Sequence, residues 1–245
     1  MPDEITLYLL IFLPIAAFFY ASVGHGGASS YLMILALAGF APEEIRPTAL
    51  LMNIGVSLIA YFNHRRSCDF PQKLFWQLAL FSIPAAFIGG LVVVDSNIYR
   101  NILGFLLIFP VLQFCGVFPK SSRKLVEKKS WMPPLIGILI GFVSGLIGIG
   151  GGIILSPLVL LLGWTNIRQT AALSALFIFV NSVAGYLGTV GFNVNLEGNL
   201  WIFVPPTILA GLLGSYYGSQ RFNGRVVRNL LTCVLAGAAI KLIFS

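Results

Sequence analysis

Hydrophobic residues gather in long runs that are separated by short polar stretches. The runs cover approximately residues 5–23, 28–40, 47–63, 74–94, 97–118, 133–148, 152–163, 167–190, 200–220 and 224–244. A helix needs about 20 apolar residues to cross the hydrocarbon core of a bilayer, and most runs approach that length. The second and seventh runs are too short to cross. The pattern therefore predicts an all-α integral membrane protein with two broken or re-entrant helices.

Each short run directly follows a cluster of glycines. The first cluster and the start of its run comprise Gly24, His25, Gly26, Gly27, Ala28, Ser29 and Ser30, and the second comprises Gly148, Gly150, Gly151 and Gly152. Further along, Ile45-Arg46-Pro47-Thr48-Ala49 matches Ile167-Arg168-Gln169-Thr170-Ala171 at a nearly constant offset. The chain is thus predicted to contain two repeats of about five helical segments each, residues 1–119 and 133–245, joined by a basic linker at 120–132.

The charged residues favour a membrane protein with a defined orientation. Only 9% of the residues are charged, whereas soluble domains carry roughly a quarter. Basic residues are enriched in cytoplasmic loops, which places the linker inside and both termini outside. Because each repeat has an odd number of segments, the second repeat must be inverted relative to the first. The net charge of +7 does not indicate nucleic-acid binding, because no basic stripe is interleaved with exposed aromatic residues.

A half-length helix would bring each glycine cluster close to the membrane midplane. The unpaired N–H groups at a helix N-terminus carry about half a positive charge, and glycines let an anion approach the backbone closely. No Asp or Glu lies inside any predicted span, so a small oxyanion fits this site better than a cation. This is the arrangement of discontinuous helices found in carrier binding sites. The alternative is that the glycines only permit close packing at a re-entrant turn.

Several polar side chains could complete the site. His25 is an ionisable residue within the apolar part of the chain, and such residues are functional candidates in membranes. Its alternative role is that of a core histidine bonded to a backbone carbonyl. Ser29 and Ser30 would add hydroxyl donors. The polar residues Asn53, Ser57, Ser174, Asn181 and Ser182 would either line the pocket or form interhelical hydrogen bonds.

Arg46 and Arg168 occupy equivalent positions in the two repeats. They could attract or gate an anion, but snorkelling to the membrane interface is the interpretation we favour. Gly137, Gly141 and Gly145 recur every fourth residue on one helix face, which favours close helix packing over a sliding surface.

The sequence offers no sign of catalysis. It contains no Ser–His–Asp set, no paired carboxylates and no metal-spaced His or Cys, so we expect neither an enzyme nor a bound metal or cofactor. The expected partners are a small anionic substrate and membrane lipid. Homodimerisation would suit a carrier of this size, although no sequence feature demands it.

The run from Gly24 to Leu32, followed by Arg46-Pro47-Thr48-Ala49, resembles the TauE/SafE sulfite exporter family, also called the toluenesulfonate uptake permeases. The run from Gly148 to Ile154 is similar to the second hallmark of that family. The resemblance implies a carrier for sulfite or small organosulfonates. His25 has no counterpart in the second motif, where Ile149 stands, so the expected site is not fully two-fold symmetric.

These observations together predict an inner-membrane carrier that works by alternating access between its repeats. An inside-negative potential drives anions outward, by about 2.3 kcal/mol per charge per 100 mV, which favours export over import. The alternatives are an anion channel of the same architecture and a carrier for another small anion.

Overall fold

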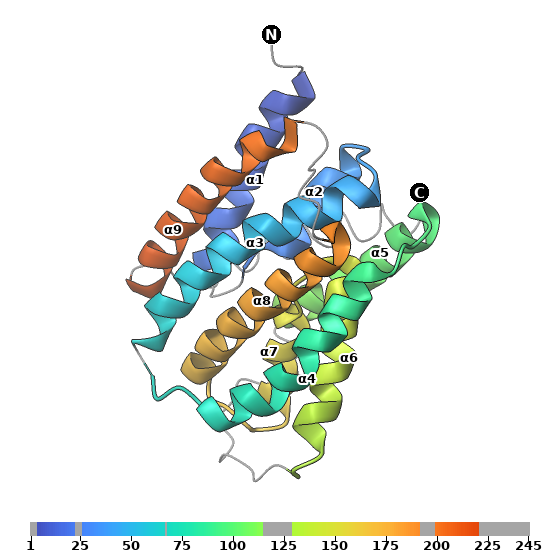
Figure 1. Ribbon diagram of the computed structural model, residues 1–245. Coiled ribbons are helices and arrows are strands. Elements are labelled where there is room, and N and C mark those ends of the chain that lie inside the picture. Colours follow the sequence, from blue (N-terminus) through green and yellow to red (C-terminus); the bar gives the residue numbers. More distant parts are fainter. Residues whose placement is uncertain (1–3, 23–25, 67, 115–128, 192–198, 221–245) are drawn as a thin grey trace.

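The computed structural model describes residues 4–22, 26–66, 68–114, 129–191 and 199–220, and every regular element within them is helical (Figure 1). In chain order the elements are α1 (Glu4–Ser22), α2 (Ala28–Leu37), α3 (Pro42–Arg65), α4 (Gln72–Leu91), α5 (Ser96–Phe114), α6 (Met132–Ile147), α7 (Gly152–Leu161), α8 (Ile167–Val190), the 3-10 helix η1 (Asn199–Phe203) and α9 (Val204–Gln220). The predicted all-α architecture is confirmed. The last predicted segment, 224–244, lies outside the described residues.

The helices fall into long and short classes, as the hydrophobic runs predict. Among the described residues, the helices long and apolar enough to cross a membrane are α1, α3, α4, α8 and the stretch Leu200–Tyr217. The helices α2 and α7 have 10 residues each. At 1.5 Å per residue, each covers only about half of an approximately 30 Å hydrocarbon core. The chain is a multi-pass membrane protein that contains half-length helices.

Local capping explains where the two longest helices begin. At the start of α8, Gln169 N–H donates to Asn166 Oδ1 at 2.9 Å and Asn166 N–H donates to Gln169 Oε1 at 3.2 Å, a reciprocal capping box. The start of α3 has Pro42 at its first position, and Ala41 N–H donates to the Glu44 carboxylate at 3.1 Å. Proline is well suited to this position because its missing N–H would be unpaired there in any case.

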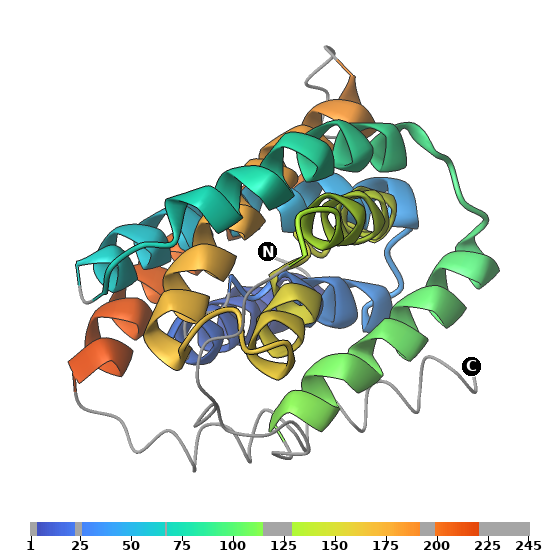
Figure 2. The same ribbon diagram turned by 90° about the horizontal axis from the view of Figure 1, so that it is seen from below.

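The long helices pack against one another in neighbouring pairs. The helices α3 and α8 lie side by side through the middle of the bundle, α4 packs against α6 and α8, and α9 packs against α1 and α3 (Figure 1). Figure 2 shows α5 at the periphery of the described helices, where it makes few contacts with the rest of them. The short helices α2 and α7 rest on α3 and α8 respectively.

Glycines allow α4 and α6 to approach until their backbones touch. A Cβ on Gly137, Gly141 or Gly145 of α6 would collide with the carbonyl oxygens of Leu78, Ser82 and Ala86, which follow one another along α4. Small residues at such spacing are typical of tight helix pairs in membranes. The structure thus confirms the packing interpretation of this glycine ladder.

The two halves of the chain repeat some of these contacts in detail. Gly89 of α4 faces the Phe142 carbonyl of α6, and Gly214 of α9 faces the Phe18 carbonyl of α1. Gly89 and Gly214 stand at matching positions of the two predicted repeats, at nearly the same offset as Ile45 and Ile167. The contact between α4 and α6 thus has its counterpart between α9 and α1, and each joins a helix of one predicted repeat to a helix of the other. The inversion of one repeat relative to the other stays a prediction.

Candidate functional site

The first helix break separates α1 from α2. The helix α1 ends at Ser22, and α2 begins at Ala28 after Gly27, whose φ is +95°. That left-handed conformation is accessible to glycine at little cost. Ser30 N–H and Tyr31 N–H both donate to Gly27 O, at 3.0 and 3.2 Å, which starts the hydrogen-bond ladder of α2. Gly24 and His25 lie outside the described residues.

The second break, between α6 and α7, has the same construction. Gly151 precedes α7 with φ +76°, and its carbonyl accepts from Ile154 N–H and Leu155 N–H at 3.2 and 3.0 Å. Both short helices also end at a left-handed glycine, Gly39 after α2 and Gly163 after α7. The two half-length helices are therefore built alike at both ends, and each presents the N–H groups of its first turn at a glycine break.

The structure brings the two breaks together at the crossing of α3 and α8. A Cβ on Gly26 would lie 3.1 Å from Ile178 Cγ2, and a Cβ on Gly150 would lie 3.0 Å from the same methyl group. Both glycines also face the side chain of Asn53: Gly26 is against its Oδ1 and Gly150 against its Nδ2. Any side chain at either glycine would collide with these atoms, so the two breaks can meet here only as glycines.

Asn53 links the two central helices and lies between the two breaks. Its exposed fraction is 0%, and its Nδ2 donates to Ser182 Oγ on α8 at 3.0 Å. Its Oδ1, the atom next to Gly26, has no hydrogen-bond partner. A buried polar atom without a partner costs about 1–3 kcal/mol. Asn53 therefore forms the expected interhelical hydrogen bond and leaves one acceptor oxygen free at the breaks.

The other polar residues of α8 lie on the same side of the helix. Asn181 Nδ2 donates to Phe177 O at 2.8 Å, while its buried Oδ1 is also without a partner. Ser174 Oγ lies 2.8 Å from Ser156 Oγ, which in turn lies 2.7 Å from Gly152 O. The site thus has one unpaired amide oxygen, Asn53 Oδ1, beside the glycine break that precedes α2, and α8 carries a second unpaired amide oxygen at Asn181.

The serines of the first break are already bonded within the protein. Ser29 Oγ donates to the Tyr20 hydroxyl at 3.1 Å, and Ser30 Oγ donates to Gly27 O at 2.7 Å. In this conformation the two hydroxyls do not point to the meeting place of the breaks as free donors. An anion would be held there mainly by backbone N–H groups, since Ala28 offers no polar side chain.

Sequence reasoning missed two residues that shape this region. The Tyr31 hydroxyl donates to Gly26 O at 3.0 Å and fixes the backbone of the first break. Ile178 separates the two breaks, although its type is ordinary for an apolar helix. The position of Tyr31 one turn after Gly27 was a usable signal, because a buried tyrosine hydroxyl requires a partner. Nothing in the sequence distinguishes Ile178 from its neighbours.

Arg46 is buried, and the expectation of interfacial snorkelling is wrong for this residue. Its exposed fraction is 5%, and its guanidinium donates to Val92 O and Gly90 O at 3.0 Å, Gly145 O at 3.1 Å and Gly89 O at 3.3 Å. A cation is favourable at the C-terminus of α4, where carbonyls lack intrahelical partners. Its sequence counterpart Arg168 is exposed. Arg46 therefore ties α3 to the ends of α4 and α6.

The electrostatic balance of the interior favours an anion over a cation. Among the described residues, Arg46 is the one charged side chain in the buried set, which contains no carboxylate. Within the same part of the chain, no group of three or more His, Cys, Asp or Glu side chains gathers as a metal site would require. The ligand chemistry on offer is that of backbone N–H groups, amides and hydroxyls.

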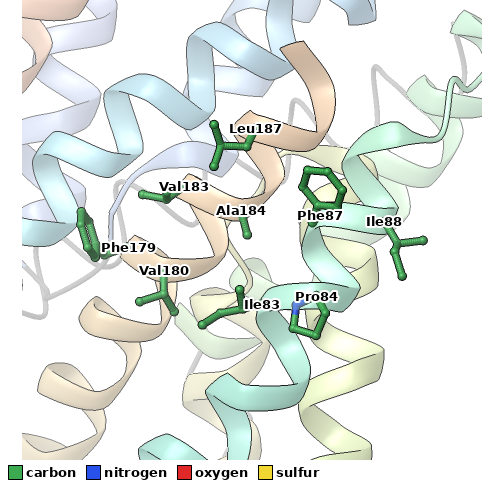
Figure 3. Close-up of a pocket in the computed structure, with 9 residues that line it drawn as sticks. All are labelled: Ile83, Pro84, Phe87, Ile88, Phe179, Val180, Val183, Ala184 and Leu187. Atoms are coloured by element: carbon green, nitrogen blue, oxygen red, sulfur yellow. The ribbon is translucent and has the colours of Figure 1, made fainter. Parts of the chain in front are cut away.

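A separate hollow of about 650 Å³ lies between α4 and α8 (Figure 3). Its lining residues are all apolar: Ile83, Pro84, Phe87, Ile88, Phe179, Val180, Val183, Ala184 and Leu187. None of them is a predicted site residue, and none offers a hydrogen bond to an anion. This hollow suits hydrocarbon and is not the candidate site.

Comparison with known proteins agrees with this description. The family profile of the sulfite exporter TauE/SafE matches residues 8–242. The chain is 32% identical to the probable membrane transporter protein y4hK of Sinorhizobium fredii, over 99% of this chain and 100% of the relative. It is 27% identical to the probable membrane transporter protein YjnA of Bacillus subtilis, over 90% of this chain and 92% of the relative.

A more distant relative is the probable membrane transporter protein MJ0441 of Methanocaldococcus jannaschii, 26% identical over 77% of this chain and 74% of the relative. No solved structure gives a significant match. The family and these relatives are named for transport and not for catalysis, which is consistent with a chain that is not an enzyme. Because the family profile covers almost the whole chain, the protein belongs to the TauE/SafE sulfite exporter family.

Proposed function

We propose that the protein is a carrier for sulfite or small organosulfonate anions that binds its substrate where the two helix breaks meet. The observation that carries this proposal is the position of Gly26 and Gly150 against the same two side chains, Asn53 and Ile178. Two half-helix N-termini thereby converge inside an apolar bundle whose buried residues, where described, include no carboxylate. Membership of the sulfite exporter family narrows the anion to sulfur oxyanions.

Substrate recognition in this proposal rests on the backbone. The first N–H groups of α2 and α7 are directed at the anion, and the glycines at residues 24–27 and 148–152 let its oxygens approach them. Successive N–H groups in a glycine turn form a concave nest for an oxyanion. Asn53, Ser174 and Asn181 supply the polar side chains around it. His25 would add a positive charge when protonated, or a single hydrogen bond when neutral.

Transport by alternating access is supported by the repeated construction of the two halves. The contacts Gly89–Phe142 and Gly214–Phe18 match one another, and each joins a helix of one predicted repeat to a helix of the other. Carriers built from repeats open to one side and then the other by moving one bundle against the other around a central site. We further propose that the repeats are inverted, that the protein lies in the bacterial inner membrane, and that both termini are outside.

Export is the proposed direction. An inside-negative potential favours the outward movement of an anion, by about 2.3 kcal/mol per charge per 100 mV. Because no acidic residue lies within the predicted spans, His25 is the remaining candidate for proton coupling. Sulfite flux that responds to neither voltage nor pH would contradict this coupling argument.

The proposed function is tested by reconstituting the purified protein in liposomes and measuring the flux of labelled sulfite. We expect slow, saturable flux that Gly150→Ala reduces at least tenfold, because the new Cβ would collide with Asn53 and Ser182. Leu139→Ala, on the exposed face of α6, is the matched control and should keep the wild-type flux. Sulfite flux no faster than in empty liposomes would reject the proposal.

The same preparation separates the carrier from a channel. Unitary currents in a planar bilayer would identify an anion channel of the same architecture, whereas a carrier gives no resolved single-molecule current. Competition by sulfate or chloride would identify a carrier for another small anion. His25→Ala should weaken sulfite binding while leaving the helical content unchanged, and unchanged affinity would assign His25 a structural role.

A further inference from the structure

The meeting place of the two helix breaks has a hydrogen-bond acceptor as well as donors. Asn53 Oδ1 is a buried amide oxygen without a partner, and it lies beside Gly26. In the same region the N–H groups at the starts of α2 and α7 are donors that no helix can pair internally. A site for a fully deprotonated anion would need donors only. An unpaired acceptor would be satisfied by a ligand that also carries a hydrogen-bond donor.

The orientation of the Asn53 amide follows from its neighbours. Its Nδ2 donates to Ser182 Oγ at 3.0 Å, which leaves Oδ1 on the side of Gly26. The amide oxygen thus stands beside the glycine turn from which α2 begins. The acceptor Asn53 Oδ1 and the N-terminus of α2 therefore lie next to one another.

Fully deprotonated oxyanions do not satisfy such a mixed site. Every oxygen of sulfite or sulfate dianion is an acceptor, so an oxygen placed at Asn53 Oδ1 would meet a like partial charge. A ligand with its own donor can give that hydrogen to Oδ1 while its anionic oxygens accept from the backbone N–H groups. Such a ligand pairs the buried Asn53 Oδ1.

We propose that the transported ligand is a sulfur oxyanion that carries its own hydrogen-bond donor, and that Asn53 Oδ1 accepts that hydrogen. The donor is either the hydroxyl of hydrogen sulfite or a hydroxyl or ammonium group on a short organosulfonate. This inference rests on the proposed function, which supplies the anion, and adds the substrate class that Asn53 selects.

The chain contains a matched amide on the same helix. Asn63 Nδ2 donates to Ser215 Oγ on α9 at 3.0 Å, the same bond length as in the Asn53–Ser182 pair. Asn63 is only partly buried, and its Oδ1 is not among the buried unpaired atoms. It therefore shares the helix and the type of bond with Asn53 but not the unpaired oxygen at the breaks.

The test is isothermal titration calorimetry of the full-length protein in detergent with three ligands of equal chain length. These are ethanesulfonate, 2-hydroxyethanesulfonate and 2-aminoethanesulfonate (taurine). We expect the two donor-bearing ligands to bind about tenfold more tightly than ethanesulfonate, since one hydrogen bond to a buried acceptor is gained. In Asn53→Leu the ratio of affinities should fall to about one, whereas in Asn63→Leu the tenfold ratio should persist.

A second titration identifies which ligand carries the hydrogen-bond donor, hydrogen sulfite or an organosulfonate. Sulfite is titrated below and above the pKa of hydrogen sulfite, with methanesulfonate as the reference that cancels any titration of the protein itself. Tighter sulfite binding on the acid side, relative to methanesulfonate, assigns the donor to hydrogen sulfite. An unchanged ratio together with a preference for 2-hydroxyethanesulfonate or taurine assigns the donor to an organosulfonate.

Equal wild-type affinities for the three ethanesulfonates would overturn the inference while leaving the carrier function intact. Tighter binding of ethanesulfonate would overturn it as well and would mean that Asn53 Nδ2, not Oδ1, lies on the side of Gly26. If no ligand binds and the liposomes show no sulfite flux, the proposed function fails too. The wild-type comparison decides these outcomes even if Asn53→Leu does not elute as a folded protein in size-exclusion chromatography.

Discussion

The group of α4, α6 and α8 corresponds, helix for helix, to the group of α9, α1 and α3, but the helices of the two groups are held together differently. Three successive glycines of α6 pack on the backbone of α4, and Arg46 ties the ends of both helices to α3. In the other group, Gly214 provides the corresponding backbone contact between α9 and α1. Arg168, the counterpart of Arg46, is exposed.

The same contrast appears where α4 crosses α8 and α9 crosses α3. Gly90 meets the backbone of Gly185 at the first crossing, whereas Asn63 and Ser215 form a hydrogen bond at the second. One crossing uses close backbone contact and the other uses polar side chains. Two repeats can therefore keep one plan while different residue types supply the attraction, because small residues and polar residues are alternative ways of joining helices in a bilayer.

The two groups should differ most in the free energy of unfolding that is lost when Arg46 or its counterpart Arg168 is replaced. Arg46→Ala should lower the free energy of unfolding by about 3 kcal/mol, because buried carbonyls of α4 and α6 lose their charged donor. Arg168→Ala should change it by less than about 0.5 kcal/mol, as for other exposed residues. Unfolding in mixed micelles of increasing SDS content, followed by circular dichroism, measures both. Equal losses would remove this distinction between the groups.

Gly145→Ala and Gly214→Ala test whether close backbone contact stabilises the α4–α6 pair and the α1–α9 pair to the same extent. Each new Cβ would collide with a carbonyl, that of Ala86 or that of Phe18. We expect each to cost about 1–3 kcal/mol in the same unfolding assay, as overpacking does. Leu139→Ala, on the exposed face of α6, is the control and should cost less. A loss confined to Gly145→Ala would show that α1 and α9 can separate without penalty.

Double-mutant cycles compare the two amide–hydroxyl pairs on α3. We expect a coupling energy of about 1 kcal/mol for Asn53 with Ser182, and about half of that for Asn63 with Ser215, because the second pair is partly exposed. Alanine replaces each residue singly and together. A larger coupling energy for Asn63 with Ser215 than for Asn53 with Ser182 would contradict the view that burial strengthens the hydrogen bond.

The smallest effect concerns the loop between α3 and α4. Burial and the nearby Asp69 carboxylate raise the pKa of the Cys68 thiol. In a variant with Cys115→Ser and Cys233→Ser, maleimide should therefore react with Cys68 more slowly near neutral pH than with a free cysteine. The reaction rate should keep rising to a higher pH than the rate of a free cysteine does. A membrane-impermeant maleimide should react from the cytoplasmic side only. Labelling from outside would reverse the proposed orientation of both groups.

The helical fold was predictable because hydrophobic run length directly reports which helices can cross a bilayer. The predicted segment 167–190 coincides with α8, and the short runs after the glycines became α2 and α7. The meeting of the two breaks was inferred from duplication, and the shared contact of Gly26 and Gly150 with Asn53 agrees with it. His25, which lies outside the described residues, stays a prediction.

The fate of individual polar groups could not be predicted from the sequence. Arg46 and Arg168 stand in matching sequence, yet one is buried against four carbonyls and the other is exposed. Likewise, Ser29 and Ser30 have hydroxyls that the sequence leaves free to bind a ligand, while the fold bonds them to Tyr20 and to Gly27 O. The partners of Arg46 lie 43 to 99 residues away and depend on which helices become neighbours, whereas those of Ser29 and Ser30 lie nine and three residues earlier.

The sequence by itself determined the membrane location, the number and length of the described helices, and the two glycine breaks, because these depend on local hydrophobicity and backbone freedom. Only the tertiary structure decided that Gly26 and Gly150 share one methyl group of Ile178 and that the Asn53 oxygen beside them has no partner. Those features arise from the packing of α3 against α8, where a polar atom is paired or unpaired according to what its neighbours can offer.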